Sequence, residues 1–349
     1  MNMSYMMDDE IKSQVGIIKN LIDEFFINYC IKIDIPLKFK QIKIIASGSS
    51  FNAAYFGKYF FENTAQTETS IDYASEFINS KFSDFDTKDT LYILISQSGN
   101  SKDTVLAMEK LKNKGAVTLC ITNNKESIMY QKCDYKIFIN AGIEKAIAAT
   151  KTFSASVFIL WLLALKKAQN NPDFSNDEIK NIYSIPPSLN NIFENIENFD
   201  MAQKILSKQK DFSIIGLGEL YPLCREMALK IKEINYINAT AYPMGEFIHG
   251  HYAILNKSKV LVIFLIGEKS EFELNTIQKI LNSYKTKTIL VSDEYLDLNC
   301  DTLVKIPSCQ SKIALLLTTI IFIQLLAMKI AIKLKRDVDK PKGLQKIVK

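Results

Sequence analysis

The feature that most constrains the fold of this chain is a pattern of short apolar runs and helical segments that occurs twice. Each half alternates strand-like runs rich in Ile, Leu and Val with segments of helical periodicity. Matching segments of the two halves lie about 170 residues apart, a spacing far longer than that of a solenoid repeat. The predicted strands are 42–46, 91–95, 117–122 and 135–139 in the first half, and 212–215, 260–266, 288–292 and 303–306 in the second. The predicted helices are 52–62, 103–113 and 153–166, followed by 223–234, 273–283 and 312–334.

This alternation predicts an α/β fold with two tandem domains, each a mostly parallel sheet between helices in a flavodoxin-like, three-layer arrangement. An opening helix is expected, capped by Asp8 and Asp9. Pro172, Pro186 and Pro187 are expected to break the chain between the domains. The expected parts are an N-terminal helix in 1–35, domains in 36–170 and 201–335, a linker in 171–200, and a C-terminal tail in 336–349.

Length and composition exclude several classes of protein. The 349 residues are enough for two domains, and 48% apolar with 23% charged residues is globular composition. The net charge of +5 is mild and dispersed, which argues against nucleic-acid binding. The first residues are acidic and lack an apolar run, so no secretory signal is expected. Residues 313–330 have the length of a membrane span but contain Gln324 and Lys329, and we interpret them as a buried helix.

None of the six cysteines forms a CxxC pair, and most of them lie in apolar runs. We therefore expect buried, free thiols and a cytoplasmic protein.

Two polar loops follow predicted strands of the first half. The loop at 96–101 contains three serines between a strand and a helix, where free backbone N–H groups favour an anion. Ser49 and Ser50 follow the neighbouring strand. No lysine stands where a nucleotide-binding loop needs one, so a phosphate monoester is favoured over a nucleoside triphosphate. Capping of the helices alone is the structural alternative.

A second polar cluster lies in the second half. Glu226, Lys230 and Glu233 fall on one face of a predicted helix, and an exposed salt-bridge stripe would give the same spacing. Both histidines of the chain, His249 and His251, follow shortly after, which indicates a polar active-site loop. The H-x-H pair has no evident third ligand nearby, so no metal is expected.

Five segments in order resemble the isomerase half of glucosamine-6-phosphate synthase and the related sugar-isomerase (SIS) type amino-sugar-phosphate deaminases. The resemblance covers nearly the whole chain, and it implies two tandem SIS domains. The segments are ASGSSFNAA (46–54), SQSGNSKDT (96–104), IEKAIAATKTF (143–153), EMALKIKEINYINATAYPMGEFIHG (226–250) and DVDKPKGLQK (337–346).

The resemblance also implies roles for individual residues. Glu233 would move a proton between C1 and C2 of the sugar, His249 of a neighbouring subunit would open the ring, and Lys346 would form a Schiff base with the keto sugar. Lys230 and Glu226 would lie around the substrate. The residues implied to bind the phosphate are Ser49, Ser50, Ser96, Gln97, Ser98 and Ser101.

These implied roles suit the chemistry, because a carboxylate, a histidine and a lysine amine are the usual groups for such steps. The resemblance implies no cofactor and a homodimer with shared active sites. The long apolar helices at 153–166 and 312–334 could cover the dimer interface.

The chain departs from the synthases in three ways that bear on its function. No glutaminase is expected, since the sequence passes directly from its first residues to the SIS region. Ala149 stands where many synthases have serine, and Leu217 and His251 replace the commoner Arg and Pro.

We therefore expect an amino-sugar-6-phosphate deaminase that converts glucosamine 6-phosphate, or a close analogue, to fructose 6-phosphate and ammonia. The alternatives are a synthase-type isomerase supplied with ammonia from solution or a separate subunit, a deglycase of fructosamine phosphates, and a sugar-phosphate sensor without turnover.

Overall fold

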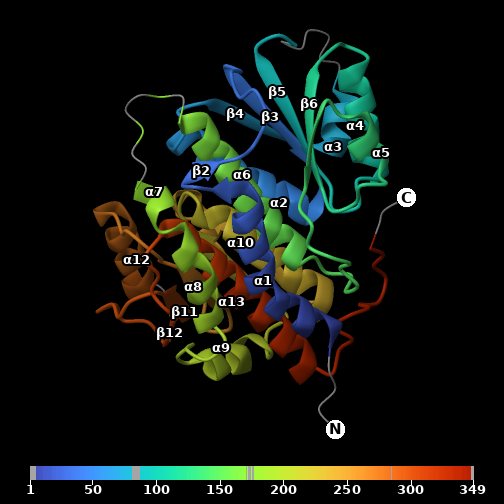
Figure 1. Ribbon diagram of the computed structural model, residues 1–349. Coiled ribbons are helices and arrows are strands. Elements are labelled where there is room, and N and C mark those ends of the chain that lie inside the picture. Colours follow the sequence, from blue (N-terminus) through green and yellow to red (C-terminus); the bar gives the residue numbers. More distant parts are fainter. Residues whose placement is uncertain are drawn as a thin grey trace. The chain divides into compact units, whose positions relative to one another are not determined.

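The structure is a computed structural model that describes residues 5–80, 87–169, 171, 174, 177–283 and 285–346. It contains two compact units, each built around one five-stranded sheet (Figure 1). The first-sheet unit comprises residues 16–144, 149–183 and 345–346. The second-sheet unit comprises residues 5–15, 145–148 and 184–344. Pro172 and residues 347–349 of the expected tail lie outside the described residues.

The first sheet is parallel throughout, in the order β4-β3-β5-β6-β7. In chain order this is 2-1-3-4-5, the flavodoxin-like arrangement. Its strands are β3 (Gln41–Ala46), β4 (Glu68–Tyr73), β5 (Thr90–Ile95), β6 (Val117–Thr122) and β7 (Tyr135–Phe138). Its helices are α2 (Gly48–Asn63), α3 (Ala74–Asn79), α4 (Lys102–Lys112), α5 (Ile128–Lys132) and α6 (Lys151–Ala168). The unit thus has the predicted architecture.

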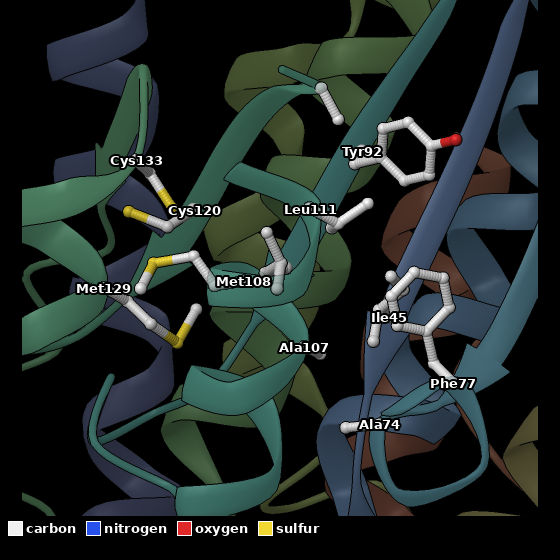
Figure 2. Close-up of a cluster of buried hydrophobic side chains, with 12 residues drawn as sticks. Ile45, Ala74, Phe77, Tyr92, Ala107, Met108, Leu111, Cys120, Met129 and Cys133 are labelled. Carbon is white, nitrogen blue, oxygen red and sulfur yellow. The ribbon is translucent and has the colours of Figure 1, made fainter. Parts of the chain in front are cut away.

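Helices cover both faces of the first sheet. On one face, side chains of β3, β5 and β6 form a cluster with α3, α4 and α5 that contains Met108, Cys120, Met129 and Cys133 (Figure 2). On the other face lie α2 and α6. A Cβ placed on Gly57 of α2 would come within 2.9 Å of Ile44 of β3 and 3.2 Å of Leu160 of α6. Ile44 and Ile45 of β3 therefore pack on opposite faces of the sheet, because side chains alternate along a β-strand.

The second sheet repeats this order as β9-β8-β10-β11-β12, again all parallel. Its strands are β8 (Asp211–Gly216), β9 (Asn238–Pro243), β10 (Val260–Phe264), β11 (Lys287–Ser292) and β12 (Thr302–Lys305). Its helices are α8 (Ile185–Asn191), α9 (Phe199–Leu206), α10 (Leu220–Asn235), α11 (Met244–Phe247), α12 (Glu271–Ser283) and α13 (Lys312–Lys333), and η2 (His251–Ile254) is a 3-10 turn. The shared order confirms the predicted duplication.

The remaining elements precede the two sheets or connect them. They are α1 (Met6–Phe25), the antiparallel pair β1 (Phe26–Ile27) and β2 (Cys30–Ile31), α7 (Asp177–Lys180) and the 3-10 turn η1 (Ile182–Ser184). The prolines expected to break the linker instead begin α8, where Pro186 and Pro187 occupy its first turn. A helix start tolerates proline because the N–H that proline lacks has no intrahelical partner there.

Helix α13 is the one helix within the described residues that is long and apolar enough to cross a membrane. Within its most apolar window, 94% is buried inside the structure, which confirms the prediction of a buried helix. The fully buried Gln324 accepts a hydrogen bond from Gln14 of α1 at 2.7 Å. A partner of this kind makes a buried amide tolerable in an apolar helix.

The cysteines only partly follow expectation. All six are free, and Cys120, Cys133 and Cys224 are buried. The prediction of burial is wrong for Cys30, which is exposed in β2, and for Cys300 and Cys309, which are half-buried. Cys30 occupies an outward position of a two-residue strand and is exposed although Tyr29 and Ile31 flank it in the sequence.

Candidate functional site

The serine loops lie at the carboxyl edge of the first sheet. Ser49 and Ser50 are in the first turn of α2, directly after β3, and residues 96–101 join β5 to α4. Because β3 and β5 are neighbours, both loops stand at the same edge. The Ser47 hydroxyl donates a hydrogen bond to Asp103 in the first turn of α4, which ties the two loops together. Sequence analysis did not identify Ser47 or Asp103, since neither residue type marks such a link.

The backbone of the loop after β5 is held in a shape that only glycine allows. Gly99 has φ +61°, and a Cβ on it would lie 2.2 Å from the Ser127 hydroxyl. Its N–H donates to the Ser96 hydroxyl at 3.2 Å, which in turn lies 3.2 Å from the Ser101 hydroxyl. The Ser98 hydroxyl accepts from the N–H of Asn100. Ser96 and Ser98 are buried and Gln97 is half-buried, and these hydrogen bonds fix the shape of the loop.

A chain of hydrogen bonds connects this loop to the segment after β7. Asn123, directly after β6, donates its N–H to the carbonyl of Gln97 at 3.0 Å. Its side chain accepts from the N–H of Ala141 and donates to the carbonyl of Gly142. Glu144 follows two residues later. The carboxyl ends of four neighbouring strands are therefore the places that carry the polar loops.

Lys346 joins this edge through an ion pair. Its Nζ lies 2.7 Å from Glu144 Oε2, and Glu144 is fully buried. Burial raises the pKa of the Glu144 carboxyl, but the charge and hydrogen bond of Lys346, together with the N–H groups of Thr150 and Thr152, outweigh it and hold the pKa below its usual value. Sequence analysis missed Glu144, although a lone acidic residue before an apolar helix was a visible signal.

The second-sheet unit holds the acidic and basic residues predicted on one helix face. Glu226 and Lys230 of α10 are both fully buried, with Lys230 Nζ 3.4 Å from Glu226 Oε1. Lys230 also donates a hydrogen bond to Glu233, whose side chain is 22% exposed. Because burial of a lone ammonium is costly, the two carboxylates stabilise Lys230. Of the three, Glu233 is the residue with a surface open to a ligand.

The two histidines lie after α11, where the chain turns at Gly250. His249 is exposed, and its backbone N–H donates to the carbonyl of Glu246. His251 packs against the ring of Tyr242 with 4.4 Å between the ring centres. Within the described ranges, no group of three or more His, Cys, Asp or Glu side chains is arranged to hold a metal ion.

Two all-parallel sheets of one strand order, with polar loops at the carboxyl ends of the strands, define a duplicated α/β protein with its candidate ligand site at these strand ends. The chain matches the SIS domain family over residues 37–166 and 205–308. It belongs to the SIS domain family.

Individual relatives agree with this assignment. The chain is 33% identical over 322 residues to the glutamine–fructose-6-phosphate aminotransferase (isomerizing) of Aquifex aeolicus, covering 90% of this chain and 53% of the relative. The chain spans about half the length of the curated relatives it matches.

The fold is also similar to solved structures. The C-terminal domain of glucosamine-fructose-6-phosphate aminotransferase from Francisella tularensis has a TM-score of 0.88 at 27% identity, over 97% of this chain and 99% of that one. The glucosamine-6-phosphate deaminase of Thermotoga maritima has a TM-score of 0.75 at 24% identity, over 98% and 99% of the two chains, and shares the fold.

Proposed function

We propose that this protein interconverts glucosamine 6-phosphate with fructose 6-phosphate and ammonia, and that it works in the deaminating direction. The proposal gives the phosphate to the serine loops of the first-sheet unit and the proton transfer to Glu233. The observation that carries it is the pairing of an amine, Lys346, with a buried carboxylate in the same unit as the serine loops. The reaction needs a site that binds the phosphate of the sugar and an amine that can attack its carbonyl carbon.

The proposed reaction begins with the ring form of the amino sugar, which His249 opens by transferring a proton. Glu233 then removes the proton from C2 and returns it to C1, while one proton of the amino group passes to O1, which leaves a C2=NH imine. The Lys346 ammonium gives one proton to the imine nitrogen and its Nζ adds to C2 as a neutral amine. A second lysine proton passes to the former amino group, the C2–nitrogen bond to that group breaks, and ammonia leaves a protonated C2–Nζ imine. Water adds to the new C2–Nζ imine, the lysine departs, and fructose 6-phosphate is formed.

The proposed direction follows from mass action. Deamination turns one sugar phosphate and water into two solutes, so a low concentration of free ammonia favours release. A second candidate is synthesis in the reverse direction with ammonia from a separate subunit. It is favoured by the 33% identity to a protein named as an aminotransferase.

A substrate assay tests the proposal. Purified protein is incubated with glucosamine 6-phosphate, and both ammonia and fructose 6-phosphate are measured. Equal amounts of the two products are expected. Lys346→Ala should lower the rate by about 10³-fold, within the range of a lost catalytic group, while Lys342→Ala, a change of an exposed lysine in the same tail, should retain it.

Other outcomes decide between the alternatives. Turnover from fructose 6-phosphate with ammonia or glutamine, but none from glucosamine 6-phosphate, would support the synthase direction. Ammonia released from a fructosamine phosphate alone would indicate a deglycase. Binding of fructose 6-phosphate without any turnover would identify a sensor.

We also propose that the protein is a homodimer in which His249 serves the neighbouring subunit. The exposure of this side chain supports the proposal, because the histidine is accessible to a second copy. Light scattering at micromolar concentration should give twice the chain mass of 39.7 kDa. A fully active monomer would contradict it.

A further inference from the structure

We infer that Glu144 is the positioning residue for Lys346, which it holds at the carboxyl edge of the first sheet before a sugar phosphate binds. This inference rests on the proposed function, because it takes Lys346 to be the group that attacks the sugar. Nothing in the comparisons assigns a role to Glu144.

The Glu144 carboxylate is fixed on both oxygens. Oε1 accepts hydrogen bonds from the N–H groups of Thr150 and Thr152 at 2.9 and 3.1 Å, and from the Thr150 hydroxyl at 3.4 Å. Oε2 accepts from the Thr152 hydroxyl at 2.8 Å and from Lys346 Nζ at 2.7 Å. The carboxylate cannot rotate without losing several of these hydrogen bonds. It therefore offers Lys346 one fixed position for its ammonium group.

The location of Glu144 reinforces this hold. Thr150 is the N-cap residue of α6, an 18-residue helix, and its own side chain does not cap the helix. Glu144 accepts the free N–H groups instead, and the positive end of the helix dipole favours its negative charge. The carboxylate is therefore both the cap of α6 and the anchor of Lys346.

An ordered lysine has a kinetic consequence. Fixing a free lysine side chain in one position costs conformational entropy. When Glu144 orders Lys346 in the unliganded protein, that cost falls on folding rather than on the reaction. Glu144 thus acts on the reaction through Lys346, without touching the sugar.

Replacement of Glu144 by glutamine separates this role from a structural one. The glutamine oxygen can take the place of Oε1 and keep the N–H donors of Thr150 and Thr152, while the Thr152 hydroxyl, which donates to Oε2, can turn to accept from the amide. The amide nitrogen then lies where Oε2 was, and its other N–H faces the Lys346 ammonium, which offers no acceptor. Glu144→Gln therefore keeps the cap of α6 and removes the lysine anchor.

The experiment compares wild type, Glu144→Gln and the exposed Glu126→Gln. Fructose 6-phosphate affinity is measured by calorimetry, and the imine at Lys346 is trapped with borohydride and quantified by peptide mass. We expect trapping in Glu144→Gln to slow by about 10²-fold, the effect of a misplaced reacting group, with affinity within twofold of wild type. Glu126→Gln should trap at the wild-type rate.

The possible failures are distinguishable. A wild-type protein that yields no adduct overturns the covalent step of the proposed function. A wild-type adduct with equal or faster trapping in Glu144→Gln overturns this inference alone. If Glu144→Gln lost both fructose 6-phosphate affinity and trapping, Glu144 would be needed for the structure of the binding loop. That result would also overturn the inference.

A measurement on the wild type covers the case in which the variant does not fold. Lysines of the unliganded protein are reductively methylated, and the rates at Lys346 and Lys342 are compared by mass spectrometry. Lys346 should react at least about tenfold more slowly than Lys342, since its ion pair with Glu144 leaves the side chain only 24% exposed to the reagent. Equal rates would overturn the inference.

Discussion

The two sheets share one strand order, yet the loops after their third strands in the chain differ in charge. After β5, Gly99 donates its N–H to a serine hydroxyl, and the loop is lined with hydroxyls. After β10, Gly267 donates its N–H to the Asp293 carboxylate at 3.0 Å. Lys269, with only 8% of its side chain exposed, lies 3.3 Å from the same carboxylate. The loop after β10 is therefore held by a carboxylate from the neighbouring strand end.

The source of that anion explains the difference. Asp293 directly follows β11, and its counterpart directly after β6 is Asn123. The Asn123 side chain bonds to Ala141 and Gly142 after β7, whereas the Asp293 carboxylate accepts from Gly267 in the loop after β10. The comparison teaches that a duplicated domain keeps its strand order while the residue at an equivalent strand end changes which neighbouring loop its side chain holds.

The largest effect is expected from a test of the proposed roles of the two units, with proton transfer in the second-sheet unit and phosphate binding in the first-sheet unit. Glu233→Gln should lower turnover of glucosamine 6-phosphate by about 10²–10⁴-fold, because the amide cannot take the proton. Fructose 6-phosphate affinity should stay within a few-fold, since the proposal gives the phosphate to the serine loops of the other unit. Steady-state kinetics and calorimetry measure the two quantities. Glu268→Gln, an exposed change after β10, is the control, and an equal loss in both variants would contradict the assignment.

Two glycines sharpen the comparison of the loops. Gly99 and Gly267 both have positive φ, so alanine at either should cost about 1–2 kcal/mol of the free energy of unfolding. A Cβ on Gly267 meets only Leu315, at 3.8 Å, whereas a Cβ on Gly99 clashes with Ser127. Gly99→Ala should therefore lose about 1–3 kcal/mol more, the cost of overpacking. Chemical denaturation measures both, and equal losses would show that the first loop is not tightly packed.

Asp293→Asn tests whether the loop after β10 depends on this carboxylate. The variant keeps an oxygen for the Gly267 N–H but loses the charge that faces Lys269, so the free energy of unfolding should fall by about 1–2 kcal/mol. Fructose 6-phosphate affinity should not change. Asp297→Asn, at an exposed position of the loop after β11, should be neutral. A stable Asp293→Asn protein would mean that Glu294, which also pairs with Lys269, suffices.

The smallest effect concerns pH. The folded-state pKa of Glu144 lies below the ordinary value of 4.5. Its contribution to stability is therefore complete above about pH 4.5 and is lost as the pH falls through the folded pKa. The difference in unfolding free energy between wild type and Glu144→Gln should shrink as the pH falls from 7 toward 3. A constant difference would show that the carboxyl keeps one protonation state.

Sequence alone predicted the duplicated α/β architecture because most strands of a parallel sheet are buried on both faces and form apolar runs. It missed β4 and β9, one strand per sheet, for the same reason. Both are edge strands with many polar residues, ETSIDY and NATAYP, and most of their side chains are half-buried or exposed. A strand that relies on one neighbour leaves no continuous apolar pattern.

The candidate site also contains residues that the sequence predicted and residues that it missed. Residues near each other in sequence were predicted together, as with the serine loop and the face of α10. The contact of Glu144 with Lys346 joins positions 202 residues apart, and no local spacing encodes such a contact. Topology brings these residues together, and only the folded chain shows it.

The same ion pair has a consequence for biosynthesis. During translation, Glu144 leaves the ribosome some 200 residues before Lys346, so the first sheet can assemble while its buried carboxylate still lacks the ammonium partner. The nascent unit must keep this edge hydrated, or hold the carboxyl protonated, until the last stretch of the described chain arrives. Completion of the first-sheet unit therefore waits for synthesis of the second.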